Sequence, residues 1–294
     1  MEVRQLEYVV ALSDERSFSR AAERMRVAQP SLSQQIKKLE KELGQTLFDR
    51  LPRGAVPTEA GKRLVQRARL ILAQLVDAGR EVSDTKNSVA GQLRVGAIPT
   101  IAPYLLPQLL HEFRARYPDA DVHVVEDVTE RLCHGVIDGD IDIAVTSSVD
   151  DDRAMHVELI GKERLWALVG ADHPLASRKS VTWKTFGKEP AVMLDDANCL
   201  AGQVSDLCTR NGVMPKVTGY GAQLTTLASM VALGLGISVV PEMMRVMDNA
   251  TDRVYLPFKG EKPTRDICVI WGLLRYRTNA ARAFEDLVRE YVAA

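Results

Sequence analysis

The sequence of 294 residues lacks the features that would place it in a specialised class of protein. It has no low-complexity tract, and its 46 % hydrophobic residues, 26 % charged residues, 19 glycines and 13 prolines are ordinary proportions. This excludes a disordered chain, a collagen and a membrane bundle. The longest uncharged stretch, 217–241, is interrupted by glycines and closed by Pro241, which predicts a buried helix followed by a buried strand. Residues 1–5 contain no charged-then-apolar signal segment, so we expect a cytoplasmic protein with no membrane partner.

Recognisable catalytic motifs are also missing. The histidines are scattered over different predicted elements, and the sequence has no cluster of metal ligands, no glycine-rich phosphate loop and no G-x-S-x-G nucleophile elbow. We therefore expect no cofactor, no metal and no enzymatic activity. Only 4 cysteines are present, Cys133, Cys199, Cys208 and Cys268, and in a reducing compartment they should not form a structural disulfide framework.

The net charge of −1 hides an uneven distribution. Residues 1–72 contain 14 Lys and Arg against 9 Asp and Glu, whereas the remaining 222 residues contain 24 against 30. A basic front on an acidic body predicts a module that binds a polyanion and is joined to a different kind of domain.

The first 55 residues predict short helices. One begins near Ser17, and after a tight turn at 26–28 another runs from Pro30 along an apolar stripe to Gly44. The polar faces of this last helix carry Ser, Gln and Lys, which can hydrogen-bond base edges and neutralise phosphates. Such a helix pair has the docking geometry of a helix-turn-helix, and residues 48–56 predict a hairpin or wing. A solvated polar face on a small helical bundle would give the same pattern.

A long helix and an α/β region follow. Residues 58–84 predict one helix with a heptad stripe that includes Leu64, Ala68, Ile71 and Leu75. We interpret it as a linker and dimer seam; packing on its own chain is the alternative. From Gly91 the elements alternate as βαβαβ, which predicts a parallel sheet. Two similar halves over roughly 200 residues predict two lobes with a ligand cleft at the strand ends.

Several blocks of sequence resemble the winged helix-turn-helix of LysR-type transcriptional regulators. These blocks are SFSRAAERM at 17–25, QPSLSQQI at 29–36, LEKELG at 39–44, LFDR at 47–50 and TEAG at 58–61. The resemblance covers essentially the whole chain and implies an α/β protein. Its expected parts are an N-terminal winged helix-turn-helix at 1–58, a linker and dimerisation helix at 59–88, and a two-lobed, periplasmic-binding-protein-like (type 2) regulatory domain at 89–294. Lobe I is expected at about 89–162 and 267–294, and lobe II at about 163–266.

The same resemblance implies partners. They are double-stranded promoter or operator DNA, further copies of the chain in a homodimer or homotetramer, and RNA polymerase. The residues expected to contact DNA lie on the helix that begins near Pro30 and on the wing: Gln29, Pro30, Ser31, Ser33, Gln34, Lys37, Arg50 and Arg53. Many family members have arginine where this chain has Gln34, so its base contacts should differ.

Cys199 and Cys208 form a notable pair. If 199–208 is one continuous helix, their Cα atoms lie roughly 13 Å apart along the axis and on opposite sides. A disulfide needs Cα atoms within about 7 Å. Either the two cysteines pack as small hydrophobic residues, or they bond only when the helix unwinds, as a redox switch.

Within the LysR family, three blocks resemble the OxyR-type hydrogen peroxide sensors. They are IPTIAPYLLP at 98–107, the segment that holds Cys199 and Cys208, and TLASMVA at 226–232 with the following Gly-Ile pair at 236–237. The resemblance implies that Cys199 is the peroxide-reactive thiolate, which passes through a sulfenic acid, and that Cys208 is the resolving thiol. The residues it implies for binding peroxide or another effector are Thr100, Thr129, Asn198 and Arg265. Family members often have histidine where this chain has Asn198. We interpret Cys133 and Cys268 as core residues.

The leading hypothesis is a LysR-type regulator that senses hydrogen peroxide through a reversible Cys199–Cys208 disulfide and activates genes of the oxidative-stress response. The alternative within the family is a small organic effector bound between the lobes, with inert cysteines; an inducer response that survives loss of Cys199 would favour it. A hypothesis from a different class is an enzyme, for example a thiol peroxidase, which would be recognised because it consumes peroxide well beyond one equivalent per chain. A transport-linked solute-binding protein conflicts with the basic front module.

Overall fold

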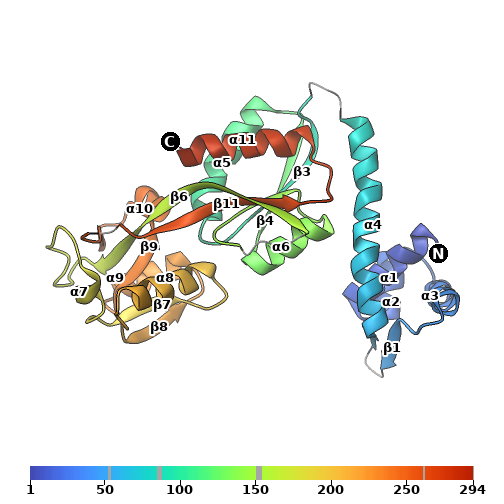
Figure 1. The fold of residues 1–294 in the computed structure, drawn as a ribbon, viewed down its shortest axis with the longest axis horizontal. Helices are drawn as coiled ribbons and strands as arrows, with labels where there is room; N and C mark the ends of the chain where they lie inside the picture. Colours follow the sequence, from blue (N-terminus) through green and yellow to red (C-terminus); the bar gives the residue numbers. More distant parts are fainter. Residues whose placement is uncertain (52–53, 85–87, 150–153, 261, 294) are drawn as a thin grey trace. The chain divides into compact units, whose positions relative to one another are not determined.

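The computed structural model describes residues 1–51, 54–84, 88–149, 154–260 and 262–293. It divides into two compact units (Figure 1). The first comprises residues 1–85 with the short segments 137–139 and 274–276, and the second comprises the rest of the chain. None of the helices in the described part of the chain is both long enough and apolar enough to cross a membrane.

The first unit opens with the helices α1 (Val3–Glu15), α2 (Phe18–Arg24) and α3 (Gln29–Leu43). The local signals act as the sequence predicts. The Ser17 side chain caps α2 by accepting a hydrogen bond from the backbone N–H of Arg20. Gly44 ends α3 with a left-handed φ of 63°. The turn between α2 and α3 contains a left-handed residue that is not glycine, Arg26, with φ of 53°.

A two-stranded wing follows α3. Strands β1 (Phe48–Leu51) and β2 (Gly54–Pro57) pair antiparallel. Gly54 has a φ of 137°, and a Cβ atom there would lie 2.2 Å from the backbone oxygen of Arg16. Only glycine therefore lets the wing sit against the α1–α2 turn, where the N–H of Ala55 donates to that same oxygen. The wing tip, with the predicted DNA contact Arg53, lies outside the described residues.

The long helix α4 (Glu59–Ser83) is capped by the Thr58 side chain, which accepts from the N–H of Gly61. Its first half completes the core of the first unit, in which Val65 joins Leu32, Ile36 and Leu39 of α3. The predicted long helix is confirmed, and its apolar stripe changes character along its length.

The second unit contains a mixed sheet in the order β10-β6-β11-β5-β3-β4, with β9 also paired to β6. Its first lobe holds β3 (Gly91–Ala97), α5 (Ala102–Arg116), β4 (Ala120–Glu126), α6 (Thr129–Asp138), β5 (Ile143–Thr146) and α11 (Asn279–Ala293). The predicted parallel arrangement is confirmed here, because β3 pairs parallel with both β4 and β5. Helices α5 and α11 pack together through Phe113 and Phe284, whose ring centres are 5.5 Å apart.

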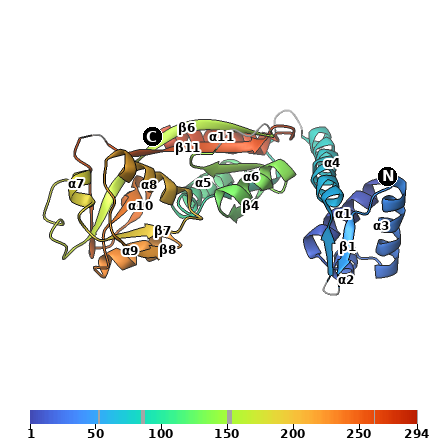
Figure 2. The same ribbon diagram turned by 60° about the horizontal axis from the view of Figure 1, so that its bottom comes forward.

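Two long antiparallel strands connect this lobe to the next. β6 (Met155–Gly170) and β11 (Thr264–Gly272) run side by side, as Figures 1 and 2 both show. The second half of β6 pairs with β9 (Ser238–Pro241) and β10 (Arg253–Leu256) in the second lobe.

The second lobe has a separate core and a small parallel sheet. It contains α7 (Trp183–Phe186), β7 (Ala191–Leu194), α8 (Cys199–Arg210), β8 (Val217–Gly221), α9 (Leu224–Ala232) and α10 (Glu242–Met247). β7 pairs parallel with β8. The prediction of a helix and then a strand over 217–241 was incomplete, because β8 precedes them. β8 is mostly exposed and so lacks the apolar pattern of a buried strand.

Candidate functional site

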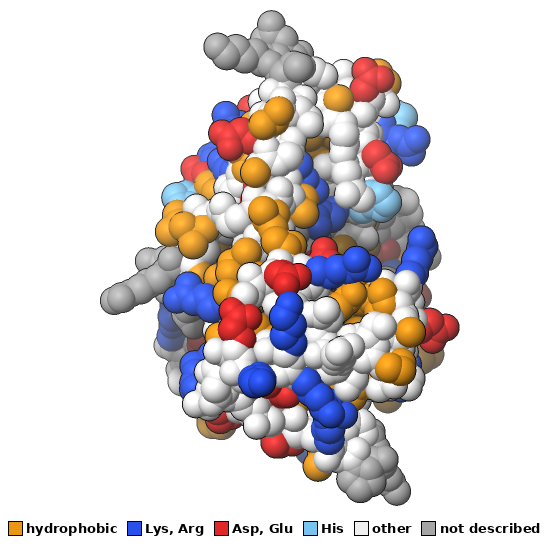
Figure 3. Space-filling model, turned by 90° about the vertical axis from the view of Figure 1, so that its right-hand side faces the viewer, with side chains coloured by type: hydrophobic (Ala, Val, Ile, Leu, Met, Phe, Trp, Pro, Cys, Tyr) orange, Lys and Arg blue, Asp and Glu red, His pale blue; other side chains and the backbone are white. Residues whose placement is uncertain are grey.

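Helix α3 presents a polar surface opposite its buried stripe. Leu32, Ile36 and Leu39 are fully buried, and most of the predicted DNA contacts on this helix are exposed: Gln29, Pro30, Ser31, Gln34 and Lys37. Figure 3 views the side on which α3 lies in Figure 1, and Lys and Arg side chains are spread over it with Asp and Glu among them. The structure therefore offers separate basic side chains on this face rather than one continuous basic patch.

Ser33 and Arg50 are brought together by the packing of the wing on α3. The Arg50 Nη2 donates to Ser33 Oγ over 3.0 Å, and the guanidinium carbon lies 4.4 Å from the centre of the Phe18 ring. The two predicted DNA contacts thus form one unit. Arg50 is exposed and fixed by two neighbours, so it can meet a phosphate with little loss of side-chain entropy.

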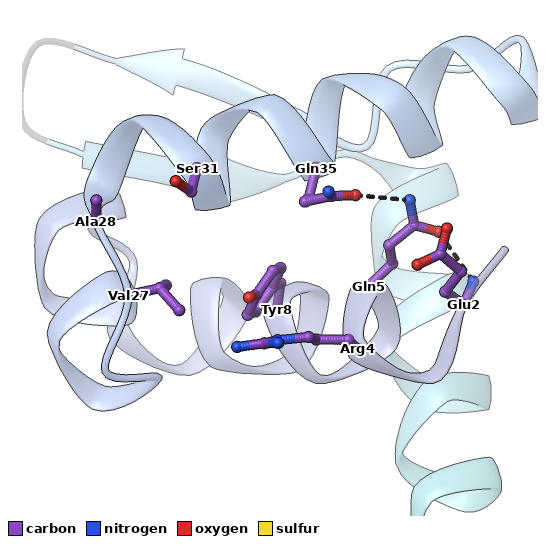
Figure 4. Close-up of a pocket in the computed structure, with 8 residues that line it drawn as sticks. All are labelled: Glu2, Arg4, Gln5, Tyr8, Val27, Ala28, Ser31 and Gln35. Carbon is purple, nitrogen blue, oxygen red and sulfur yellow. Dashed lines mark hydrogen bonds between the residues drawn. The ribbon is translucent and has the colours of Figure 1, made fainter.

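A groove of about 340 Å³ lies between α1 and α3 (Figure 4). Gln5 Nε2 donates to Gln35 Oε1 over 3.1 Å at one end, and the Arg4 side chain lies against the Tyr8 ring, 5.9 Å from its centre. Arg4 is exposed and opens into the same groove as Ser31. Arg4 is not among the DNA contacts predicted from the sequence, although it belongs to the basic excess of residues 1–72.

The α4 stripe divides into a packed half and an exposed half. Ala68 is buried and Leu64 is half-buried, because α4 packs on α1 in this region. Further along, Ile71 is 40 % exposed and Leu75 49 % exposed. The alternative, packing on its own chain, therefore holds for the first half, and a dimer seam stays a prediction for the exposed residues of the second half. In this second half Ala73 and Asp77 are buried, whereas Ile71 and Leu75 are apolar side chains that one chain leaves exposed to water.

The two cysteines of α8 lie in unlike surroundings. Cys199 is the first residue of the helix and is half-exposed, whereas Cys208 is buried and burial raises the pKa of its thiol to about 11. Both are free thiols, and α8 is continuous between them. The condition that separates the Cα atoms by roughly 13 Å is thus met, and a disulfide requires α8 to unwind.

Asn198 occupies the N-cap position of α8, but its side chain makes no capping hydrogen bond. Its Nδ2 donates to Asp195 Oδ1 over 2.8 Å and to the backbone oxygen of Ala222 over 3.3 Å. Asn198 therefore ties the start of α8 to the turn that precedes it and to the loop between β8 and α9, a position from which it fixes the backbone of Cys199.

The face of α8 that carries Cys199 contacts the first lobe. Gln203 lies one helical turn after Cys199, on the same face, and its Nε2 donates to Ser147 Oγ over 2.9 Å. Its Oε1 is buried and has no hydrogen-bond partner in the described part of the chain. Next to Ser147, the hydroxyl of Thr146 lies 3.3 Å from that of Thr129. The structure thus joins predicted Thr129 to Thr146, whose chain neighbour Ser147 bonds to Gln203 on the Cys199 face. The spacing of four from Cys199 could have signalled Gln203.

Thr100 and Arg265 also come together, through direct hydrogen bonds. Arg265 Nη1 donates to Thr100 Oγ1 over 2.8 Å and Nη2 donates to the Thr100 backbone oxygen over 3.0 Å. Arg265 Nε donates to Glu163 Oε2 over 2.7 Å. All three nitrogens of Arg265 are therefore engaged by Thr100 and Glu163, and the structure joins Arg265 to the predicted peroxide site through Thr100.

Metal ligands do not gather within the ranges that the structure describes: no three His, Cys, Asp or Glu side chains are arranged to hold an ion. The chemistry available is that of a half-exposed thiol, hydroxyls, an amide and a buried guanidinium.

A two-domain regulator is the class of protein that this fold defines, with a winged helix-turn-helix, a long helix and a two-lobed body in which Cys199 lies on the α8 face that contacts the first lobe. The family comparisons agree. Residues 3–62 match the bacterial regulatory helix-turn-helix protein, lysR family, and residues 86–293 match the LysR substrate binding domain. The chain belongs to the LysR family.

Individual relatives point to one branch of that family. The hydrogen peroxide-inducible genes activator of Dickeya chrysanthemi is 34 % identical over 293 residues, which span 99 % of this chain and 96 % of the relative. A cysteine variant of full-length OxyR from Pseudomonas aeruginosa superposes with a TM-score of 0.82 at 29 % identity, over 98 % of this chain and 95 % of that one. A cysteine variant of Corynebacterium glutamicum OxyR with hydrogen peroxide bound gives 0.66 at 30 % identity, over 99 % and 96 %. The predicted resemblance to LysR regulators of the OxyR type is confirmed.

Proposed function

We propose that this protein is a DNA-binding transcriptional regulator that senses hydrogen peroxide by a reversible Cys199–Cys208 thiol/disulfide switch. The observation that carries the proposal is the asymmetry of α8. A half-exposed cysteine begins the helix on the face that contacts Ser147, and a buried cysteine follows nine residues later in the same helix. A relative that matches this chain over nearly its whole length is named as a hydrogen peroxide-inducible genes activator, which supports the same assignment.

The chemistry proceeds in two steps. The Cys199 thiolate attacks one peroxide oxygen; the S–O bond forms, the O–O bond breaks, and the leaving hydroxide takes up a proton to become water. The Cys208 thiolate then attacks the sulfenic sulfur; the S–S bond forms, the S–O bond breaks, and the leaving hydroxide takes up a proton to become a second water. Two thiols and one peroxide thus give one disulfide and two waters. The raised pKa of Cys208 keeps this thiol protonated while α8 is folded, so the second step follows unwinding.

Thr100, Thr129 and Gln203 are the residues that we propose hold the peroxide, with Asn198 fixing the start of α8. Hydroxyl groups can donate to a peroxide oxygen, and the free Gln203 Oε1 can accept from a peroxide O–H. Arg265 acts on this site through its bonds to Thr100.

The output is DNA binding by paired winged modules. We propose that α3 and the wing contact operator DNA through Gln29, Pro30, Ser31, Ser33, Gln34, Lys37, Arg50 and Arg53. The exposed half of α4, with Ile71 and Leu75, would form the dimer seam, and dimers would assemble further into a tetramer. Refolding of α8 would change how the regulatory domains meet, and so how the DNA-binding modules address the promoter and RNA polymerase.

The test is peptide mass analysis without reductant after about one equivalent of hydrogen peroxide is added to the reduced protein. A Cys199–Cys208 crosslink is expected, with Cys133 and Cys268 still alkylatable. The variant Cys208→Ser should stop at a sulfenic acid on Cys199, which dimedone traps. If the wild-type protein keeps both thiols, the disulfide-switch hypothesis is wrong. The alternative within the LysR family, an organic effector bound between the lobes, then replaces it. Footprinting of both redox forms then tests DNA binding separately.

A further inference from the structure

A buried ion pair connects the strands between the lobes to the proposed peroxide site. Glu163 on β6 and Arg265 on β11 lie directly opposite each other in the antiparallel ladder. Glu163 is only 7 % exposed, and Arg265 and Thr100 are each 2 % exposed. Removing two charges from water costs free energy that can exceed the gain from their attraction, so a buried ion pair is weak evidence of a purely stabilising role.

Each polar atom of this pair has a defined partner. Glu163 Oε2 accepts from Arg265 Nε over 2.7 Å, and Glu163 Oε1 accepts from the backbone N–H of Met243, in the first turn of α10, over 2.6 Å. The two remaining nitrogens of Arg265 donate hydrogen bonds to the side-chain and backbone oxygens of Thr100. The guanidinium is therefore held in one plane between a carboxylate and a threonine.

This arrangement fixes the direction of the Thr100 hydroxyl. A threonine hydroxyl has one hydrogen to donate and two lone pairs that accept. Because a guanidinium can only donate, Thr100 Oγ1 must be the acceptor of the 2.8 Å bond, and its own hydrogen must point elsewhere. In the described part of the chain, that hydrogen has no acceptor. Thr100 follows the carboxyl end of β3, and Thr146 ends its parallel neighbour β5, so both lie at the same edge of the sheet.

We propose that Glu163 is a positioning residue for peroxide sensing: through Arg265 it orients the Thr100 hydroxyl as a hydrogen-bond donor to the peroxide. This inference rests on the proposed function. As the Cys199 thiolate attacks, the O–O bond breaks and the leaving oxygen gains negative charge, which a donated hydrogen bond stabilises. Glu163 itself touches neither peroxide nor thiol.

The test compares two reagents on Cys199 of the full-length protein. Hydrogen peroxide needs the Thr100 hydrogen bond, whereas iodoacetamide needs only an accessible thiolate. In Glu163→Gln one carboxylate oxygen becomes an NH₂ group that cannot accept from Arg265 or Met243. We expect the second-order rate constant for peroxide to fall about tenfold and that for iodoacetamide to change less than about twofold. The matched control is Glu158→Gln, on the same strand, which breaks an outward ion pair with Arg289 and should leave both rate constants within about twofold of wild type.

A double-mutant cycle asks whether Glu163 acts through Thr100. Thr100→Val removes the hydroxyl and keeps the shape, so it should slow peroxide oxidation by at least as much as Glu163→Gln does. Adding Glu163→Gln to Thr100→Val should then cost nothing further. An equal loss with and without the Thr100 hydroxyl, or an equal loss for both reagents, would overturn the proposal and leave Glu163 a purely structural residue.

Two further measurements separate a variant that fails to fold, and a failure of the proposed function, from a failure of the positioning role. If Glu163→Gln does not fold, Arg265→Lys replaces it in the same cycle, because one ammonium group keeps the charge but cannot engage Glu163 and both Thr100 oxygens in the same plane. Dimedone trapping on wild-type protein separates the two hypotheses. Absence of sulfenic acid in wild type contradicts the proposed function, whereas normal trapping with an unaffected Glu163→Gln variant contradicts only the positioning role.

Discussion

The requirement that α8 unwinds predicts how its packing sets the redox potential of the protein. Val204 lies in the middle of α8 and is 3 % exposed. If oxidation unwinds the helix, the reduced form buries this side chain and the oxidised form exposes it. Val204→Ala therefore destabilises the reduced form and leaves the oxidised form nearly unchanged, which makes oxidation easier.

The size of the effect follows from the groups removed. Two buried methyl groups contribute about 0.8 kcal/mol each, and the cavity left behind adds to this. The better helix propensity of alanine returns about 0.5 kcal/mol. With about 1 kcal/mol for that cavity, the net loss in the reduced form is about 2 kcal/mol. Because about 1.4 kcal/mol corresponds to 30 mV for two electrons, the reduction potential should become more negative by about 40 mV.

The assay equilibrates each variant in thiol/disulfide buffers of graded potential, quenches with acid, and measures the fraction of Cys199–Cys208 disulfide by mass. Val239→Ala is the matched control. Val239 is also 3 % exposed and lies in the same lobe, but on β9, outside the helix that we propose unwinds on oxidation. It should lower the melting temperature of both redox forms and leave the potential within about 10 mV of wild type. The reasoning is refuted if Val204→Ala shifts the potential no more than Val239→Ala does, because α8 would then stay folded on oxidation.

Three further predictions test the DNA-binding unit, the seam and the acid stability of the second lobe. Arg50→Ala removes a cation and frees Ser33; fluorescence anisotropy should show operator affinity reduced about tenfold and a salt slope smaller by about one, and an unchanged slope would exclude a phosphate contact. Leu75→Glu puts a charge into the exposed half of α4; sedimentation should show loss of dimers at unchanged monomer stability, whereas intact dimers would place the seam elsewhere. The Arg253 hydrogen bond lowers the pKa of Asp248 from 3.8 to about 2. The charged carboxylate therefore stabilises the fold above about pH 4, and this contribution, about 1–2 kcal/mol after solvent screening, is lost as the pH falls toward 2. Urea unfolding of Asp248→Asn should show that loss at pH 7 and a much smaller difference from wild type near pH 2.

The sequence predicts the first unit well because its signals are local. Ser17 caps α2, Gly44 ends α3, and the apolar stripe of α3 faces the core as its spacing requires. Each of these depends on side chains within a few residues of one another, so the printed order of residues contains the information.

The strands between the lobes show the opposite case. β6 extends over Met155–Gly170, and its first half is set by pairing with β11 about a hundred residues later. Glu163 meets Arg265 only because of that pairing, and no local pattern marks the carboxylate. Family resemblance supplied Thr100 and Arg265 separately; the hydrogen bonds that join them to Glu163 required the fold.

Because Cys199 is half-exposed and Cys208 is buried in α8, the stability of this helix also affects whether the sulfenic acid is oxidised further. Once Cys199 is a sulfenic acid, it either meets Cys208 or is attacked by a second peroxide and becomes an irreversible sulfinic acid. The first route waits for α8 to unwind, and the second depends only on peroxide concentration. Helix stability therefore acts in two directions: a firmer α8 raises the potential and holds the reduced form, but it also lengthens the life of the sulfenic acid. The packing of Leu200, Val204 and Cys208 must keep α8 folded in the absence of peroxide and still let it open faster than a second peroxide arrives.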